Sequence, residues 1–561
     1  MTTAPSPDAT LQQKIAAART LPGQPEPLCP WRNFTALFSH QATTRPDAPY
    51  LIYRDGGNRE VFTYAEAFTR SCQLANFMRE KLGLKAGDRI GTVAYNHPET
   101  VFITFAAWLA GLVVVPFNAG DSDDRMVFSF NNAEVKAVFA MPDLVQRVAD
   151  ARPELETAEY FIQIGGDPLA GFTPLTSAET CPRNAPKAED INHTTEALIV
   201  YTSGTTGNPK GVLLEQGQVL TDAHCITDWF GFNETHTAMN VLPIHHVNGL
   251  IVTLATPLYA GGGVVLSRKF SASIYWQHVA EEGCQWGSVV PTVLSFLMEA
   301  KPENIPEHNL EFLICGAGPL TTETAQRFEN TFPVKIIHGY GLSESTCYSC
   351  YLPFDLSEPR RKKWLTEMGY PSIGVPLPCN DMAIHDPEGN ALEAGARGEI
   401  VIRGQNIMRE YFKRPEANAE TFAHGWFQSG DEGFFELDER GRPFFFITGR
   451  LKEVIIRGGV NYSPLEIDEV LARIKGVKAG MAVGFEHNMY GEEIGAYIQL
   501  EEGATLTQDD ILNACQALPF PKRPKVVIFG DDFPVTATGK YQRLKLKPLF
   551  AEYQDIQFKE N

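Results

Sequence analysis

Residues 201–211 have the composition of a phosphate-binding loop. The run follows an apolar stretch and reads Tyr201-Thr202-Ser203-Gly204-Thr205-Thr206-Gly207-Asn208-Pro209-Lys210-Gly211. Glycines let backbone N–H groups approach an anion, hydroxyl groups donate further hydrogen bonds, and a lysine adds positive charge. Such a loop suits the β- and γ-phosphates of a nucleotide. It is not a Walker A loop, which requires G-x-x-x-x-G-K-[ST], because Gly211 follows Lys210.

Further segments place carboxylates, hydroxyls, a histidine and cations beside glycines or after short apolar runs. Taken singly, each has an ordinary interpretation, since a lone histidine is usually structural, an isolated Glu344 or Lys540 would be a solvated surface group, and Asp431 would be a turn residue. The chemistry also fits a nucleotide, because magnesium prefers carboxylate and phosphate oxygens and Asp431 can accept two hydrogen bonds from a vicinal diol. The segments are Pro243-Ile244-His245-His246-Val247-Asn248-Gly249, Gly316-Ala317-Gly318-Pro319-Leu320, Gly339-Tyr340-Gly341-Leu342-Ser343-Glu344-Ser345, Trp426-Phe427-Gln428-Ser429-Gly430-Asp431, Gly449-Arg450-Leu451-Lys452 and Pro534-Val535-Thr536-Ala537-Thr538-Gly539-Lys540.

This ordered series resembles the signature of the adenylate-forming superfamily, which includes acyl-CoA synthetases, the adenylation domains of peptide synthetases and beetle luciferases. One such segment could arise by chance, whereas the same order over most of the chain is highly specific. The chain differs from the usual pattern at Ser343 and Ser429, where the family more often has threonine. Because serine retains the hydroxyl, we expect function to be retained.

The resemblance implies a role for each matched position. Catalytic roles would belong to Lys540 at the carboxylate and α-phosphate oxygens, to Glu344 as the Mg²⁺ ligand, and to His246 in the carboxylate pocket. Lys452 would be the hinge of a small mobile C-terminal domain, and Gly458 and Gly459 would line the tunnel for the pantetheine arm of coenzyme A. The implied ATP-binding residues are Thr202, Ser203, Gly204, Thr205, Thr206, Gly207, Lys210, Gly316, Ala317, Gly318, Tyr340, Gly341, Ser343, Asp431 and Arg450.

The reaction that this resemblance implies is the ligation of a carboxylic acid to coenzyme A. The acid and MgATP would give acyl-AMP and pyrophosphate, with charge at the α-phosphate stabilised electrostatically. After the small domain rotates, a thiol would attack the acyl carbon and release AMP. Two alternatives remain open: a standalone enzyme that loads an acyl or aryl acid onto a carrier protein, and a non-catalytic nucleotide-binding protein. A medium or long fatty acid and an aromatic acid fit equally well.

Two or more domains are expected, because 561 residues exceed what a single core accommodates. Helical patterns alternate with short apolar runs up to about residue 450, which indicates an α/β domain of sheets covered by helices, with residues 1–30 as a loose lead-in. Residues 101–117 are too short and too interrupted to cross a bilayer and predict a buried helix followed by a buried strand. The apolar runs read as strands include Ala197–Tyr201, Gly263–Leu266, Phe312–Cys315 and Val334–His338.

The pattern changes towards the C-terminus, where residues 451–561 predict a small α+β domain. Residues 434–449 read as a β-hairpin that turns at 438–441, and residues 454–457 read as a strand. Ser463-Pro464-Leu465-Glu466 predicts a helix start in which the serine caps and the glutamate reaches back. Further strands are expected at Ala482–Phe485, Tyr497–Leu500 and Val526–Phe529.

The net charge of −20 argues against nucleic acid as a partner. ATP and coenzyme A are also anions, so positive charge must be concentrated locally, and residues 360–363 and 522–525 are candidate contacts for the 3′-phosphate of coenzyme A. The ten cysteines, including Cys347 and Cys350, are most simply reduced thiols of a cytoplasmic protein, and the N-terminus has no apolar signal segment. The acid pocket is expected to draw on residues 286–292, 316–318 and 340–346.

Overall fold

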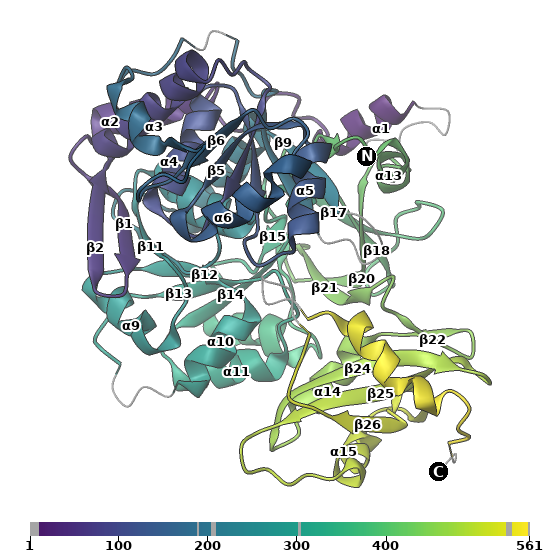
Figure 1. Ribbon diagram of the computed structural model, residues 1–561. Helices are drawn as coiled ribbons and strands as arrows, with labels where there is room; N and C mark the ends of the chain where they lie inside the picture. Colours follow the sequence, from purple (N-terminus) through teal and green to yellow (C-terminus); the bar gives the residue numbers. More distant parts are fainter. Residues whose placement is uncertain (1–9, 188–189, 203–208, 301–304, 535–540, 559–561) are drawn as a thin grey trace.

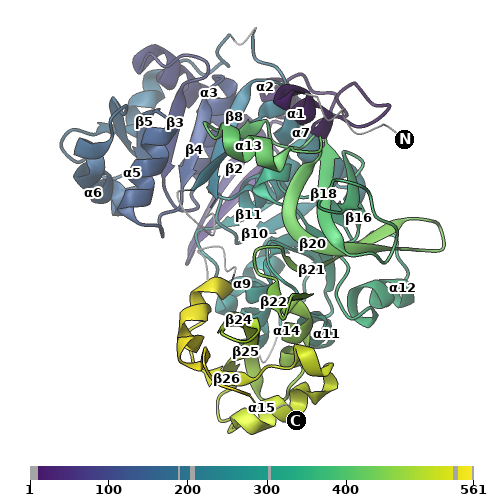
Figure 2. The ribbon, with the colours of Figure 1, turned by 90° about the vertical axis from the view of Figure 1, so that its right-hand side faces the viewer.

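The computed structural model describes residues 10–187, 190–202, 209–300, 305–534 and 541–558 (Figure 1). A large α/β part contains two big sheets and a smaller antiparallel sheet, and a small α+β part follows it. In both ribbon views the small part lies beside one end of the large part (Figure 2). Among the described helices, none combines the length and apolar character that crossing a bilayer requires.

The first large sheet is eight-stranded, and its central strands are parallel. Alternate side chains of β4 enter different cores: Val114 packs with the buried helix α4, whereas Val113 and Val115 pack with α5 and α6. The predicted buried helix and strand at 101–117 are therefore confirmed. The strands are β3 (Arg89–Val93), β4 (Val113–Phe117), β5 (Val135–Ala140), β6 (Tyr160–Gln163), β7 (Thr173–Pro174), β8 (Glu196–Thr202), β9 (Lys210–Glu215) and β19 (Glu410–Tyr411), and the helices are α3 (Tyr64–Asn76), α4 (Pro98–Leu109), α5 (Asp123–Asn132), α6 (Pro142–Ala151), α7 (Gln216–Phe230) and α13 (Pro415–Thr421).

The second large sheet is nine-stranded, and β10, β11, β12, β13 and β14 run parallel within it. Ligands of open α/β sheets bind beyond the carboxyl ends of such strands, so the loops that follow β10, β12, β13 and β14 define one edge of interest. The strands are β1 (Pro49–Asp55), β2 (Asn58–Thr63), β10 (Thr237–Asn240), β11 (Gly263–Ser267), β12 (Trp286–Val289), β13 (Phe312–Cys315), β14 (Lys335–Tyr340), β15 (Cys350–Tyr351) and β16 (Val375–Pro376), and the helices are the π-helix η4 (Asn248–Ala255), α8 (Thr256–Ala260), α9 (Ala272–Glu281), α10 (Pro291–Glu299), α11 (Thr322–Thr331) and α12 (Glu358–Lys362).

The smaller antiparallel sheet leads the chain out of the large part. It contains β17 (Asn380–His385), β18 (Gly398–Gly404), β20 (Phe427–Leu437) and β21 (Pro443–Arg450). The predicted hairpin is confirmed, since β20 pairs with β21 and Asp438 accepts hydrogen bonds from the turn, including one from Arg442 N at 2.8 Å. Strand β20 begins earlier than predicted, so that Asp431 lies within it.

The small part has its own apolar clusters, which are formed by buried residues from Ile455 onward. Its elements are β22 (Ile455–Arg457), β23 (Val460–Tyr462), α14 (Pro464–Ala472), β24 (Val477–His487), β25 (Gly491–Leu500), α15 (Gln508–Ala514), β26 (Val526–Phe529) and the 3-10 helix η9 (Arg543–Tyr553). The predicted helix starts at Pro464, but the capping box was wrong. The Ser463 hydroxyl donates to the Thr448 carbonyl, and Glu466 pairs with Lys522 Nζ at 2.6 Å.

The lead-in is more ordered than expected. Helix α1 (Leu11–Ala18) buries Ile15 and Ala18, and it is followed by α2 (Phe34–Thr44). Arg19, just beyond α1, forms an ion pair with the mostly buried Glu215. Helix α1 and one ion pair therefore attach residues 10–19 to the large part, so this portion of the predicted loose lead-in is ordered. The remaining turns are η1 (Phe77–Lys81), η2 (Arg152–Glu154), η3 (Leu175–Thr180), η5 (Ser343–Ser345), η6 (Lys363–Glu367), η7 (Cys515–Ala517) and η8 (Phe520–Lys522).

Candidate active site

The predicted phosphate loop connects two antiparallel neighbours, β8 and β9. Thr202 at the end of β8 lies opposite Lys210 at the start of β9, and the Thr202 hydroxyl donates to the Lys210 carbonyl at 3.4 Å. The ammonium of Lys210 lies 4.6 Å from the centre of the Tyr411 ring, a favourable cation–π arrangement. Ser203, Gly204, Thr205, Thr206 and Gly207 lie outside the described residues.

Glu344 is buried close to the Lys210 side of the site. Its Oε1 atom accepts a hydrogen bond of 2.7 Å from the Tyr411 hydroxyl, so Tyr411 links Glu344 to Lys210. The Glu344 carbonyl accepts from Met408 N at 2.7 Å, which fixes the backbone. Sequence reasoning missed Tyr411, because it lies 67 residues from Glu344 and in none of the matched segments.

The site also fits a magnesium ion that arrives with phosphate. Among the described residues, no group of three or more histidine, cysteine, aspartate or glutamate side chains is placed to hold a metal. Magnesium in nucleotide sites needs only one or two carboxylates, because phosphates and water supply the other oxygens. Glu344 presents such a carboxylate: Tyr411 holds one oxygen, and the other accepts no hydrogen bond from the residues that the structure describes.

Asp431, Tyr340 and Arg450 form a compact polar group. Asp431 is buried, its Oδ2 accepts from the Tyr340 hydroxyl at 2.7 Å, and its Oδ1 lies 3.0 Å from Arg450 Nε. Strand pairing explains the second contact, since Asp431 and Arg450 are cross-strand partners in β20 and β21. The carboxylate raises the pKa of the Arg450 guanidinium, and burial together with Asp431 raises the pKa of the Tyr340 phenol. Arg450 therefore stays cationic and Tyr340 stays protonated.

Ser429 holds the backbone that carries Asp431. Its hydroxyl accepts from Asp431 N at 3.0 Å and donates to the Ile400 carbonyl at 2.6 Å. A threonine hydroxyl could make both contacts, so serine at position 429 keeps the hydrogen bonds that the more usual threonine would form. Each Asp431 oxygen keeps a lone pair beyond its present partner, which leaves acceptors for a diol.

The glycine loops at the ends of β13 and β14 are required by close packing. A Cβ atom on Gly316 would lie 2.5 Å from the Tyr348 hydroxyl, and one on Gly341 would lie 1.9 Å from the Cys347 carbonyl. Ala317 has a φ of 64°, in the left-handed region that costs energy for a residue with a side chain. At Gly318 the nearest atom, in Pro291, would be at an ordinary 3.5 Å.

His246 follows β10 at the same sheet edge. Its ring lies 4.3 Å from that of His245, and burial lowers the pKa of His245 to about 4. Two residues later, Asn248 Nδ2 donates to the Tyr348 hydroxyl at 3.3 Å, and Asn248 Oδ1 accepts from Ser288 Oγ at 2.7 Å. The sequence quoted Asn248 without assigning it a role, and only the fold brings it to Tyr348.

Some candidate residues serve the structure elsewhere. Trp286, in one of the predicted pocket segments, stacks on Phe232 in the core, with 4.2 Å between the ring centres. In the cationic runs, Arg361 is buried against Glu329 at 2.5 Å, Arg360 forms an ion pair with Glu439, and Lys522 pairs with Glu466. All ten cysteines lie in the described ranges, are buried, and form no disulfide.

The predicted hinge and tunnel residues lie on exposed turns. Lys452 is in the turn after β21, where Leu451 N donates to the Gly430 carbonyl at 2.9 Å and Glu453 N donates to the Arg450 carbonyl at 2.8 Å. Gly458 and Gly459 form the tip of the β22–β23 hairpin and have φ values of 59° and 79°. Their turn requires the left-handed region, which glycine adopts without strain.

Lys540 lies outside the described residues. On either side of it, Gln542 N donates to the Pro534 carbonyl at 2.7 Å. Arg543, which the sequence groups with the predicted catalytic loop, is buried and holds the small part together. It pairs with Asp468 at 2.6 Å and lies 3.4 Å from Glu453.

The two parts meet where α14 approaches the start of α11, side by side in both ribbon views (Figures 1 and 2). The carboxylate of Glu469 on α14 accepts from Thr322 N at 3.0 and 3.2 Å and from the Thr322 hydroxyl at 2.6 Å. Arg473, the residue that follows α14, donates to the same hydroxyl at 3.0 Å. Glu469 therefore caps the start of α11 and ties the two parts of the chain together.

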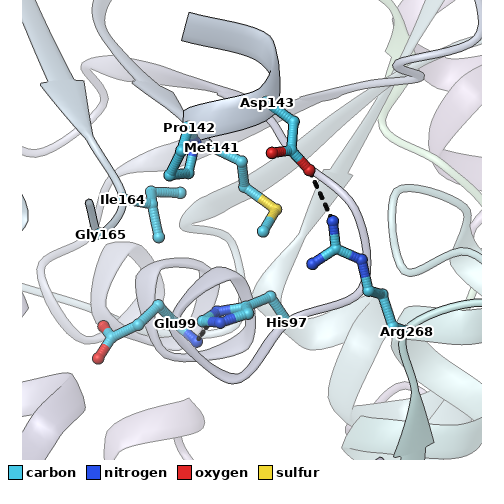
Figure 3. A pocket seen from close by; sticks show the side chains of 8 residues that line it. All are labelled: His97, Glu99, Met141, Pro142, Asp143, Ile164, Gly165 and Arg268. Carbon is cyan, nitrogen blue, oxygen red and sulfur yellow. Dashed lines mark hydrogen bonds and ion pairs between the residues drawn. The ribbon is translucent and has the colours of Figure 1, made fainter. Parts of the chain in front are cut away.

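A cavity of about 260 Å³ lies apart from these groups (Figure 3). Arg268, just after β11, reaches across it to Asp143 at the start of α6, with 2.7 Å between their charged atoms. None of its lining residues is among the predicted site residues. They are His97, Glu99, Met141, Pro142, Asp143, Ile164, Gly165 and Arg268.

Family models match both parts of the chain. The model described as AMP-binding enzyme matches residues 38–412, and that described as AMP-binding enzyme C-terminal domain matches residues 466–540. A sulfoacetate–CoA ligase of Cupriavidus necator is 32% identical over 519 residues, which cover 91% of this chain and 96% of the relative. A long-chain-fatty-acid–CoA ligase of Bacillus subtilis is 27% identical, with 92% of this chain and 94% of the relative covered.

A solved structure shares the same architecture. The crystal structure of ATP-bound MatB from Rhodopseudomonas palustris superposes with a TM-score of 0.82 at 26% identity, covering 93% of this chain and all of that one. The family models extend over more than half of the chain and match its two parts in order. This chain therefore belongs to the AMP-binding enzyme family of adenylate-forming ligases.

Proposed function

We propose that this chain joins a carboxylic acid to coenzyme A in two steps. The acid and ATP give acyl-AMP and pyrophosphate, and the thiol of coenzyme A then displaces AMP to give the acyl thioester. The observation that carries the proposal is the placement of two polar groups around one short segment. Tyr340 ends β14 beside Asp431 and Arg450, and Glu344, four residues later, contacts Tyr411 near Lys210.

In this proposal Asp431 accepts hydrogen bonds from the ribose diol, and Tyr340 presents its ring to adenine. Arg450 and Lys210 provide the local positive charge that binding an anionic nucleotide requires in a chain with a net charge of −20. Glu344 holds Mg²⁺, which neutralises phosphate charge when bound. Charge that develops at the α-phosphate is then stabilised by groups already in place, the usual source of catalysis in acyl and phosphoryl chemistry.

The remaining assignments concern the acid and the small domain. His246 lines the carboxylate pocket, and Lys540 contacts the carboxylate and α-phosphate oxygens during the first step. Rotation about Lys452 then brings Gly458 and Gly459 to the site, so that one cleft serves both steps. We place the enzyme in the cytoplasm, where ATP, coenzyme A and a reducing environment coexist.

The experiment is acid-dependent exchange of labelled pyrophosphate into ATP, followed by thioester detection. The enzyme is incubated with ATP, Mg²⁺ and a panel of carboxylic acids, with either coenzyme A or a phosphopantetheinyl carrier protein as acceptor. We expect exchange with at least one acid and thioester formation on coenzyme A. If the thioester formed on the carrier protein alone, the acceptor would be a carrier protein and not coenzyme A. An absence of exchange with every acid would contradict adenylation.

A further inference from the structure

The backbone that carries Glu344 contains a strained turn at Thr346. Glu344 lies in the 3-10 turn η5, and Thr346, directly after that turn, has a φ of 66° and a ψ of −54°. Cys347 N donates to the Ser345 carbonyl at 2.7 Å, so Thr346 is the central residue of a γ-turn of the rare, strained kind. A β-branched residue with positive φ is unfavourable, and it persists only where the surrounding structure holds it there.

The stretch of chain that follows β18 holds this turn from one side. The Thr346 hydroxyl donates to the Asn406 carbonyl at 2.6 Å, and Met408 N donates to the Glu344 carbonyl at 2.7 Å. Further along the same stretch, the Tyr411 hydroxyl donates to Glu344 Oε1 at 2.7 Å. The strained residue, the main chain of Glu344 and one carboxylate oxygen are therefore all held by one short stretch of chain.

The side chain of Asn406 fixes that stretch in the protein interior. Asn406 has an exposed fraction of 0%, and its Nδ2 donates to Asp222 Oδ1 on α7 at 3.0 Å and to the Tyr348 carbonyl at 3.0 Å. The amides of Asn406 and Asn380 pair with each other, at 2.5 Å in one direction and 3.2 Å in the other. One amide therefore joins α7, β17 and the chain just beyond the strained turn.

Asp222 presents a neutral acceptor to this amide. Its side chain is fully buried in α7, and burial raises the pKa of Asp222 to about 8, with hydrogen bonds from Asn406 and from the Tyr348 backbone opposing the rise. The carboxyl is therefore mostly protonated at neutral pH, and its oxygen accepts from Asn406 without an unpaired buried charge. An asparagine at position 222 would present an equivalent carbonyl oxygen.

We propose that Asn406 is a positioning residue for magnesium, because the hydrogen bonds of its amide hold the strained turn in the arrangement that presents the Glu344 carboxylate to the ion. This inference rests on the proposed function, in which Glu344 holds Mg²⁺. Without the amide, the Asn406 carbonyl loses its support, Thr346 relaxes to an unstrained φ, and the carboxylate two residues earlier shifts. Removing a partner that acts through a metal ligand typically changes metal affinity or activity by about 10–100-fold.

The test measures how much magnesium strengthens nucleotide binding, which requires no turnover. The affinity of the purified enzyme for α,β-methylene-ATP, whose α–β bridge resists cleavage, is measured by calorimetry with Mg²⁺ and with EDTA. The ratio of the two dissociation constants is the magnesium effect. We expect Asn406→Ala to lower this effect by about tenfold and to raise the Mg²⁺ concentration for half-maximal pyrophosphate release by a similar factor.

Matched variants separate positioning from a general loss of structure. Asp222→Ala removes the acceptor on α7 and should also lower the magnesium effect, whereas Asp222→Asn keeps the oxygen and should retain the wild-type value. Asn76→Ala is the control, since Asn76 on α3 is a buried asparagine whose Nδ2 donates to the carbonyls of Pro182 and Asn184 at 2.9 and 2.8 Å. Its loss should lower the Tm and leave the magnesium effect unchanged.

A double variant tests whether Asn406 acts through Glu344. In a Glu344→Gln background, Asn406→Ala should lower the magnesium effect by less than about twofold more, because the charge that it positions is already absent. A further tenfold loss in that background would overturn the inference. So would an unchanged magnesium effect in a folded Asn406→Ala protein. If that protein does not fold, equal magnesium effects in Asp222→Ala and Asp222→Asn would overturn it.

Failure of the proposed function gives a different result. If magnesium did not strengthen nucleotide binding to the wild type, or if Glu344→Gln alone had the wild-type magnesium effect, the assignment of Glu344 to magnesium would be wrong, and the role of Asn406 would be wrong with it.

Discussion

At the scale of single residues, the Asp431 carboxylate on β20 contacts Tyr340 at the end of β14 and Arg450 at the end of β21. Asp431→Asn keeps the shape of the side chain but removes its charge and one acceptor oxygen. We expect kcat/KM for ATP to fall by about 10–100-fold, because hydrogen bonds to charged groups are the stronger ones. Initial rates over a range of ATP concentrations measure this.

The control for that variant is Glu436→Gln, which makes the same charge change on the same strand. Its ATP dependence should match that of the wild type. An equal loss in both variants would mean that the charge of the strand, and not the Asp431 contact, determines ATP binding.

Glu344 supports a second prediction, which concerns magnesium. Glu344→Gln retains an oxygen for the Tyr411 hydroxyl but removes the charge, so we expect the Mg²⁺ concentration for half-maximal pyrophosphate release to rise and the maximal rate to fall by about 10²–10³. A magnesium titration of the two proteins tests this. Glu410→Gln, beside Tyr411 on β19, is the matched control, and a similar shift there would contradict the assignment to Glu344.

The sequence predicted Glu344, Asp431 and Arg450 as site residues because each stands in a contiguous segment. It could not predict the contact of Tyr411 with Glu344 or that of Asn248 with Tyr348, because these contacts join positions 67 and 100 residues apart. Such pairs are created by strand order and loop packing, which local spacing does not encode. Arg543 stands in its expected segment, but that segment could not reveal its structural ion pair with Asp468.

At the scale of elements, the loop after β13 depends on the absence of a side chain. Gly316→Ala would place a methyl group 2.5 Å from the Tyr348 hydroxyl and 2.7 Å from the Gly339 carbonyl, and the backbone cannot yield cheaply. We expect a loss of about 1–3 kcal/mol in stability, typical of overpacking, and a lower Tm by differential scanning calorimetry. Gly318→Ala, whose new atom would meet only Pro291 at 3.5 Å, should leave the Tm unchanged.

A Gly316→Ala protein with an unchanged Tm would mean that Tyr348 has room to move.

Apolar runs were sufficient to predict strands such as β13 and the β20–β21 hairpin, because burial on both faces or alternation leaves a clear pattern. The capping box at Ser463 failed for a different reason. Helix start signals are local. Here, however, the Ser463 hydroxyl donates to the Thr448 carbonyl of the preceding sheet, and the Glu466 carboxylate forms an ion pair with Lys522. Tertiary contacts therefore override a local motif where two parts of the chain meet.

At the scale of the whole molecule, the contact of Glu469 with the start of α11 ties the small part to the large one. Burial raises the pKa of Glu469 from 4.5 to about 7, with Arg473 and the Thr322 hydrogen bonds opposing the rise and Asp468 adding to it. A carboxyl with a raised pKa binds its proton more tightly in the docked arrangement. Docking is therefore favoured at low pH and weakens as the pH rises from about 4.5 to 7.

Energy transfer between two dyes measures this docking. Cysteines introduced at the exposed positions Asp509 and Glu388 can be labelled selectively, because the native cysteines are buried. We expect the docked fraction of the wild type to fall between about pH 5 and 7. Glu469→Gln should abolish that pH dependence, and an unaltered pH profile in this variant would show that another group controls docking.

Two parts were expected from length and from the change of pattern near residue 450, and the apolar clusters separate at about the same place. How the parts touch was beyond the sequence, because Glu469 and Thr322 belong to segments 147 residues apart and neither is unusual in its own context.

The burial of all ten cysteines matters in an enzyme whose acceptor substrate is itself a thiol. Burial raises the pKa of Cys29 and Cys515 to about 11 and that of Cys72 to about 12, so these sulfurs scarcely ionise at neutral pH. Because the thiolate is the reactive form, the protein should neither acylate itself from its own mixed anhydride nor exchange with oxidised coenzyme A. Intact-mass spectrometry after iodoacetamide should show no carbamidomethyl adduct on the native protein and adducts after unfolding in guanidinium.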